Sequence, residues 1–194
     1  ALSRDGKTVF VKNGQGVLVV DATSWQIRQT LPYDAKEGAT MYGMAVSPDG
    51  GKLYVTTTTH RLREATFAEG KLKWGRSVAL PGTDAKKQSY PCGVAISDDG
   101  ATALVCLSMN GTIAIVDLAS GKAHRALDGD ASVMPDKSVK IVIDGKPVLG
   151  PTGETPAFHS DAIALSHDGE YLYYQPIAAK ALYRVKTDAL RDPN

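Results

Sequence analysis

Short apolar runs recur along the whole chain, and polar turn residues separate them. Four segments share one pattern, in which alternating apolar residues lead through a serine to Asp-Gly: ALSRDG at 1–6, AVSPDG at 45–50, AISDDG at 95–100 and ALSHDG at 164–169. A second β-rich run follows each segment, at residues 8–11, 52–56, 103–107 and 171–174. Such a pattern is typical of β-hairpins, because Asp caps free N–H groups and Gly takes the positive φ of the turn. No amphipathic helical period is present, which favours an all-β fold.

The first and third units continue alike, with an apolar strand at 17–21 and 112–117 and a more polar strand at 26–31 and 122–127. The glycines of the four Asp-Gly pairs are 44, 50 and 69 residues apart. The first two spacings fit the ~40–50 residues of a four-stranded propeller blade. We therefore expect a single β-propeller domain over 1–194, with about four four-stranded antiparallel blades at roughly 1–40, 41–90, 91–130 and 159–194. The longest spacing contains two β-rich runs around Asp144-Gly145, which predict an inserted hairpin at 138–150.

A propeller protects its strand edges by closing its ring. The first unit starts within its inner strand, and the fourth stops soon after its hairpin. We therefore expect this chain to form part of a ring of six to eight blades.

The repeats resemble two propeller families. The segments YGMAVSPDGGKLYV at 42–55 and YPCGVAIS at 90–97 resemble the YVTN/YncE-type bacterial repeat, over about residues 1–127. The segment DAIALSHDGEYLYYQP at 161–176, with ALYRVKTDALRD at 181–192, is similar to the yellow/major royal jelly protein propellers and, distantly, to the SMP-30/gluconolactonase group. These resemblances imply an exported protein, since most members are exported, and some bind small amines or hydrolyse lactones.

The charge balance argues against a nucleic-acid partner. The chain has 22 Lys and Arg against 21 Asp and Glu, without the basic excess of a nucleic-acid binder.

No apolar run reaches the ~18–20 residues that span a bilayer, so we expect no membrane span in this segment. A signal peptide would lie upstream of Ala1, and we expect a periplasmic or extracellular location. The expected partner is a small molecule or a protein.

Meander topology places the Asp-Gly turns at one end of every blade and the strand entries with the second-strand exits at the other. Loops on a rigid scaffold at such a mouth usually carry binding groups. The predicted ligand-binding residues there are Tyr42, Tyr90, His60, Asn110 and Gln175.

His159 and Asp161 are the predicted catalytic pair, because an Asp can orient an imidazole that acts as a base or a ligand. A strand-capping Asp161 beside a solvated His159 is the alternative. Asp161 is also the candidate for a divalent metal, although the lactonase metal site is not matched, since Tyr174-Gln175 stands where that family has a second ligand. The acidic residues Asp128, Asp130 and Asp136 offer oxygen ligands for calcium, or else simply form a solvated loop.

Cys92 and Cys106 lie on neighbouring predicted strands, where they form either a disulfide or two buried thiols.

Three functions are compatible with these features. The first is an exported module that binds a small molecule or a protein at the channel mouth. The second is an enzyme of the lactonase or tautomerase kind, using metal-assisted lactone hydrolysis or proton transfer. The third is a structural propeller segment of a larger protein. The enzyme requires His159, Asp161 and a further polar group to converge within hydrogen-bond reach.

Overall fold

The structure is a computed structural model that describes residues 1–34, 37, 43–82, 89–156 and 158–191. It is all-β apart from one short helix, α1 (Thr187–Arg191). The first two sheets contain β1 (Thr8–Lys12), β2 (Gly16–Asp21), β3 (Ile27–Pro32), β4 (Met44–Val46), β5 (Lys52–Thr57), β6 (Arg61–Ala68) and β7 (Lys71–Ala79). The remaining strands are β8 (Pro91–Ile96), β9 (Thr102–Leu107), β10 (Thr112–Asp117), β11 (Ala123–Ala126), β12 (Val142–Ile143), β13 (Lys146–Pro147), β14 (Ser160–Leu165), β15 (Tyr171–Pro176) and β16 (Tyr183–Lys186).

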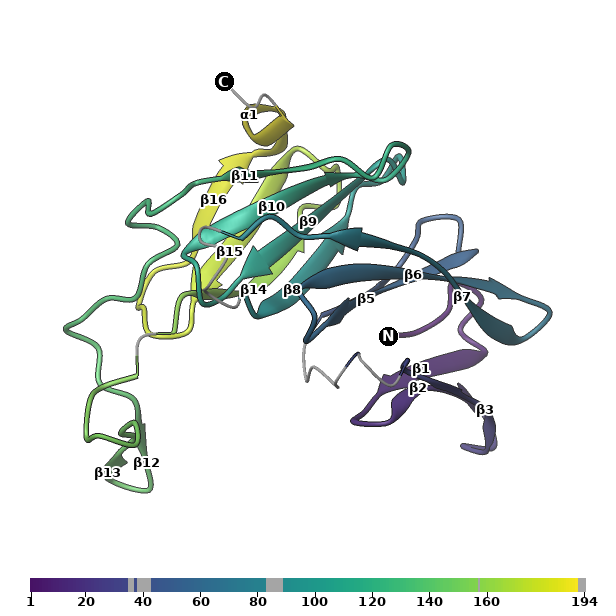
Figure 1. Cartoon of the computed structure of the whole chain (residues 1–194), viewed down its shortest axis with the longest axis horizontal. Coiled ribbons are helices and arrows are strands. Elements are labelled where there is room, and N and C mark those ends of the chain that lie inside the picture. The colour runs from purple at the N-terminus through teal and green to yellow at the C-terminus, as the bar shows by residue number, and fades with distance from the viewer. Residues whose placement is uncertain (35–36, 38–42, 83–88, 157, 192–194) are drawn as a thin grey trace.

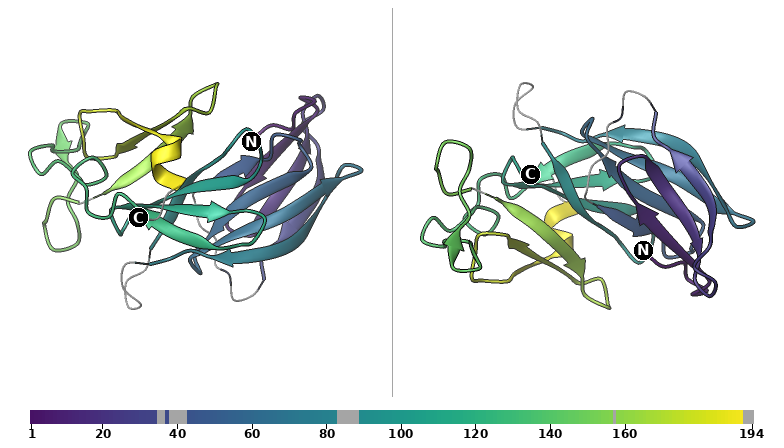
Figure 2. Two further views of the ribbon diagram at one scale, coloured as in Figure 1. Left: turned by 90° about the horizontal axis from the view of Figure 1, so that it is seen from above. Right: turned by 90° about the horizontal axis from the view of Figure 1, so that it is seen from below.

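The strands form antiparallel meanders that follow one another in chain order, as the blades of a propeller do (Figures 1 and 2). The second and third sheets have four strands, β4–β7 and β8–β11, whereas β1–β3 and β14–β16 form sheets of three. In the first sheet a single bridge between Leu2 and Val9 marks the place of the inner strand. The two-stranded hairpin β12–β13 projects away from the sheets, within the predicted insertion (Figure 1).

The Asp-Gly segments form the same corner four times. At each corner a serine hydroxyl donates to the aspartate two residues on, at 2.5–2.7 Å, and accepts a backbone N–H five residues on, at 2.9 Å. The four glycines have φ between +68° and +77°, a region that glycine occupies without steric cost. These contacts are all local, which explains why the same six-residue pattern makes the same turn in every sheet.

The hydrophobic core lies between successive sheets and is divided into three clusters. Phe10 and Val17 of the first sheet pack on Leu53 and Val55 of the second. The second interface packs Tyr54 and Leu62 against the third sheet, and the third packs Leu104 and Ile113 against Leu172 and Tyr174. The third sheet has a neighbour on both faces, so β9 and β10 are almost wholly buried, whereas β16 alternates between half-buried and exposed residues.

Glycines let the inner strands approach one another around the common axis. A Cβ on Gly43 would lie 2.0 Å from the carbonyl oxygen of Cys92, and a Cβ on Gly93 would lie 2.4 Å from that of Asp161. No other residue fits such a distance. The inner strands β4, β8 and β14 therefore lie side by side, with the four corners at one end of the sheets. Across the described ranges, no helix has the length and apolar character to cross a membrane.

Candidate functional site

The end of the sheets opposite the corners is made of strand entries and second-strand exits, and we call it the mouth. At this end the entry of one sheet meets the exit of the sheet before it. Two histidines lie at such meeting points, His60 in the exit after β5 and His159 in the entry before β14.

His60 joins the exit of the second sheet to the entry of the third. Its Nδ1 lies 3.2 Å from the backbone nitrogen of Ser89 and 3.0 Å from the Ser89 hydroxyl. A backbone N–H can only donate, so Nδ1 accepts, and the neutral ring carries its proton on Nε2. The His60 backbone has a φ of +60°, a left-handed conformation that turns the side chain into this contact.

His159 joins the entry of the fourth sheet to the exit of the third, and here the histidine lies in the entry and its partner in the exit. Its Nδ1 donates to the backbone carbonyl of Ser108 at 2.7 Å, so in the neutral ring Nε2 keeps its lone pair. The ring packs beside Gly111 and Met134 at the start of β10. In their neutral forms, one of the two half-buried imidazoles thus has a donor at Nε2 and the other an acceptor.

His159 and Asp161 have different partners in the structure. The pairing of β14 with β15 shifts between Ser160 and Ala162, which interrupts the regular alternation of side chains at Asp161. Asp161 lies instead beside the Cys92 thiol of β8. No hydrogen bond joins the two predicted catalytic side chains, both of which the structure describes.

A further set of side chains at the mouth comes from one repeated position, nine residues after each corner serine. Its members are Lys12, Thr56, Cys106 and Gln175. The first three reach the inner strand of the next sheet: the Lys12 ammonium lies 3.4 Å from the Gly43 carbonyl oxygen, the Thr56 hydroxyl 3.5 Å from that of Cys92, and the Cys106 thiol 3.9 Å from that of Ala162. Lys12 also donates to the Thr56 carbonyl at 2.8 Å. Burial lowers the pKa of Lys12 to about 7.

This set can be found in the sequence by counting nine residues from each corner serine. A search for side chains of one chemical type misses Lys12 and Thr56, because the four residues differ in chemistry. Of the other predicted residues, Gln175 donates to the Ala179 carbonyl at 3.3 Å, and Asn110 is half-buried in the turn after β9. Tyr90 is 44% exposed, with a φ of +38°. Tyr42 lies outside the described residues.

The acidic residues that could have held calcium serve as local caps. Asp130 and Asp136 accept the N–H and hydroxyl of the serine two residues on, and Asp128 pairs with Arg125 at 2.9 Å. In the part of the chain that the structure describes, no three His, Cys, Asp or Glu side chains are grouped to hold a metal ion.

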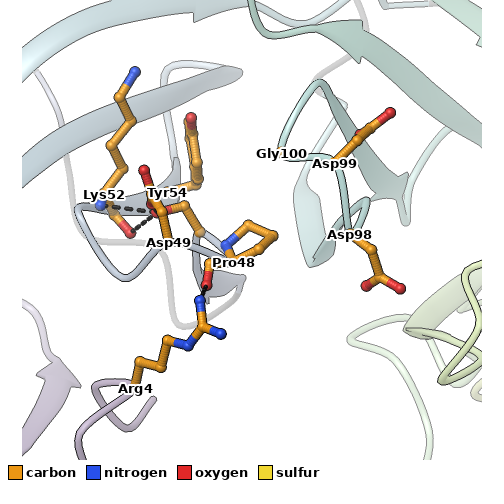
Figure 3. A pocket seen from close by; sticks show the side chains of 9 residues that line it. Arg4, Pro48, Asp49, Lys52, Tyr54, Asp98, Asp99 and Gly100 are labelled. Atoms are coloured by element: carbon orange, nitrogen blue, oxygen red, sulfur yellow. Dashed lines mark hydrogen bonds between the residues drawn. The ribbon is translucent and has the colours of Figure 1, made fainter.

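The corner end carries a polar cleft of about 380 Å³ between the corners of the second and third sheets (Figure 3). On one wall, Arg4 donates to the Pro48 carbonyl at 2.5 Å and Lys52 pairs with Glu64 at 3.2 Å. Hydrogen bonds from Ser97 and the Ala101 N–H lower the pKa of Asp99 on the opposite wall. Most of the charges around the cleft are therefore already engaged in holding the corners.

Comparison with known families identifies one match. A family model described as major royal jelly protein matches residues 52–194, which include β5–β7 of the second sheet, the whole third sheet and the last sheet. The royal-jelly resemblance of the C-terminal part is thus confirmed and extends further toward the N-terminus, while the YVTN-type resemblance stays a prediction. No protein of curated function matches the chain in sequence.

Solved structures share the fold. A "putative 6-phosphogluconolactonase" from Bacteroides uniformis superposes with a TM-score of 0.64 at 16% identity, over 96% of this chain and 49% of that one. A protein from Lactobacillus plantarum gives 0.67 at 17% identity, over 97% and 53%. The Kuenenia stuttgartiensis hydrazine synthase gives 0.54 at 20%, over 97% and 62%. The chain thus spans about half to three fifths of these proteins, and the likeness extends to the propeller fold alone.

Proposed function

Because the chain belongs to the major royal jelly protein family, we propose that it is part of an exported propeller that binds a small polar molecule at the mouth. The observation that carries this proposal is the pair of fixed imidazoles. His60 offers a donor at Nε2 and His159 an acceptor, and each ring is anchored through Nδ1 to the loop of the neighbouring sheet. Groups held in place before binding cost less conformational entropy when a ligand arrives.

The experiment isolates the two Nε2 atoms. In the substitutions His60→Asn and His159→Asn, the shorter amide can take over the role of Nδ1 toward Ser89 or Ser108 but places nothing where Nε2 was. His167→Asn is the matched control, because His167 is exposed at a corner, at the opposite end of the sheets. The full-length protein is titrated by calorimetry with tryptamine, as an aromatic amine, and with gluconate, as a polyhydroxy acid.

We expect at least one probe to bind. Affinity should fall about tenfold in each mouth variant, as for one lost hydrogen bond of ~1.4 kcal/mol, and stay unchanged in His167→Asn. Absence of binding, or equal binding by all three variants, would contradict the proposal. Export is tested separately by fractionating the native cells, where the protein should be found outside the cytoplasm.

An enzymatic function remains the second candidate because His159 keeps a basic lone pair at Nε2. A lactonase or tautomerase would use that lone pair to take a proton, without the orienting carboxylate that Asp161 was predicted to supply. Turnover of δ-gluconolactone that is lost in His159→Asn and kept in His167→Asn would favour the enzyme over a binding module.

A further inference from the structure

Cys92 and Cys106 lie opposite each other on the adjacent strands β8 and β9 of the third sheet. β8 pairs with β9 through Pro91 with Leu107 and Val94 with Val105, which leaves Cys92 and Gly93 together facing Cys106. Residues that face each other in an antiparallel pair have Cα atoms about 4.5–5.5 Å apart. A disulfide requires a Cα separation of about 4.4–6.8 Å, a range that includes this spacing, and the irregular pairing places two residues of β8 opposite Cys106.

The two side chains also point the same way. The Asp161 carboxylate of β14 raises the pKa of both thiols, after the larger effect of burial, and the Cys92 thiol contributes to raising the pKa of Cys106. The Cys106 thiol also lies against the Ala162 carbonyl of β14, so both sulfurs lie toward the junction of the third and fourth sheets. Both cysteines are reduced and fully buried in this structure, at 2% and 0% exposure.

Each thiol contributes to that junction while it is reduced. The Cys92 thiol donates to the Tyr90 carbonyl at 3.2 Å, and the Cys106 thiol lies 3.9 Å from the Ala162 carbonyl oxygen. Next to them, the Ser160 hydroxyl is buried at 1% exposure without a hydrogen-bond partner among the described residues. Replacing two S–H groups by an S–S bond therefore costs one hydrogen bond to the Tyr90 carbonyl and one longer contact with the Ala162 carbonyl.

We propose that Cys92 and Cys106 form a reversible disulfide under oxidising conditions, at the inner edge of the junction between the third and fourth sheets. With oxidised glutathione, one cysteine thiolate attacks a glutathione sulfur and releases a glutathione thiolate. The second cysteine thiolate then attacks the mixed disulfide and releases the second. Two S–H bonds and one S–S bond break, one new S–S bond forms, and both protons end on the two reduced glutathiones.

The disulfide changes the mouth as well as the stability. The loop from 92 to 106 contains 15 residues, for which cross-linking of the unfolded chain predicts a rise in Tm of several degrees. Oxidation also removes the S–H group of Cys92 that donates to the Tyr90 carbonyl in the entry of the third sheet. Because burial raises the pKa of Cys92 to about 12, oxidation of the folded protein should be slow at neutral pH and accelerate with rising pH.

The test is refolding of the full chain from denaturant in a glutathione redox buffer, followed by alkylation under denaturing conditions and mass spectrometry. We expect that neither cysteine is alkylated and that neither carries a glutathione adduct. The Tm should rise by about 5–10 °C and return to its original value on reduction. Cys92→Ser and Cys106→Ser are the controls, since each leaves one sulfur that can form only a mixed disulfide. Two alkylated thiols, or glutathione adducts alone, in the refolded wild type would overturn the proposal, whether or not the mouth binds a ligand.

Discussion

Gly93 lies on β8 where the inner strand of the next sheet comes closest. A Cβ at this position would lie 2.4 Å from the Asp161 carbonyl oxygen and 2.7 Å from a methyl group of Ile163. The first of these atoms belongs to the backbone, so it cannot move aside by a side-chain rotation. The substitution Gly93→Ala therefore tests directly whether β8 and β14 pack as closely as the propeller arrangement requires.

The magnitude follows from the contact distances. Ordinary van der Waals contact for a Cβ begins near 3.4 Å, so β8 and β14 would have to separate by about 1 Å at this point. Overpacking of this kind costs about 1–3 kcal/mol, reduced by the ~0.5–1 kcal/mol that alanine gains over glycine in a strand. We expect Gly93→Ala to lower the free energy of unfolding by about 1–2 kcal/mol.

Gly75→Ala on β7 is the matched control. Its Cβ would find its nearest neighbours at 3.5 Å, and Gly75, like Gly93, has no positive φ. It should be neutral or slightly stabilising. The assay is urea unfolding followed by circular dichroism. If Gly93→Ala proves as harmless as Gly75→Ala, the inner strands do not touch as described and the reasoning fails.

Three further perturbations test other parts of the structure. Lys12→Met should remove a pH dependence of stability. Burial lowers the pKa of Lys12 from 10.5 to about 7, so between these pH values the unfolded chain binds more protons than the folded protein. In urea unfolding, the stability of the wild type should therefore rise with pH in this range by up to about 1.4 kcal/mol per pH unit relative to the variant. A flat difference between pH 7 and 10 would contradict this. Ser97→Ala should cost about 1–2 kcal/mol in the same assay, because it removes the acceptor of the Thr102 N–H. An NMR titration of this variant should show the pKa of Asp99 moving up toward its ordinary value. Ser120→Ala is the control: it should leave the pKa of Asp99 unchanged and cost less, since the Lys122 N–H that its hydroxyl accepts is exposed to water. Arg63→Met should cost about 3 kcal/mol because it leaves the Glu37 carboxylate, only 11% exposed, without its cation. The double variant Arg63→Met, Glu37→Gln should recover most of the loss, and a double variant no more stable than the single one would contradict this origin.

The corners were predictable from the sequence because their chemistry is local. Serine, aspartate and glycine meet within six residues, and no distant contact decides their geometry. The same reasoning predicted the all-β fold of antiparallel sheets, since strand runs and turn signals repeat along the chain. It could also place His60 and His159 at the mouth, because their position depends only on which end of a strand they follow or precede.

The relation between His159 and Asp161 could not be predicted. In a regular strand, residues two apart share a face, so the sequence favours a pair. The irregular pairing at Ser160 and Ala162 breaks that rule, and it depends on how β15 and the third sheet fit against β14. The anchoring of His159 on the Ser108 carbonyl likewise joins residues 51 apart, which no local pattern encodes.

The most direct test of the account is an NMR titration of the 15N-labelled full-length protein with whichever of tryptamine and gluconate binds in calorimetry. The account predicts shifts of backbone amides at His60, Ser89 and His159, and unchanged amides at the corner glycines Gly50, Gly100 and Gly169. Shifts confined to those corner glycines would place the ligand in the cleft at the other end of the sheets and contradict the assignment of the mouth.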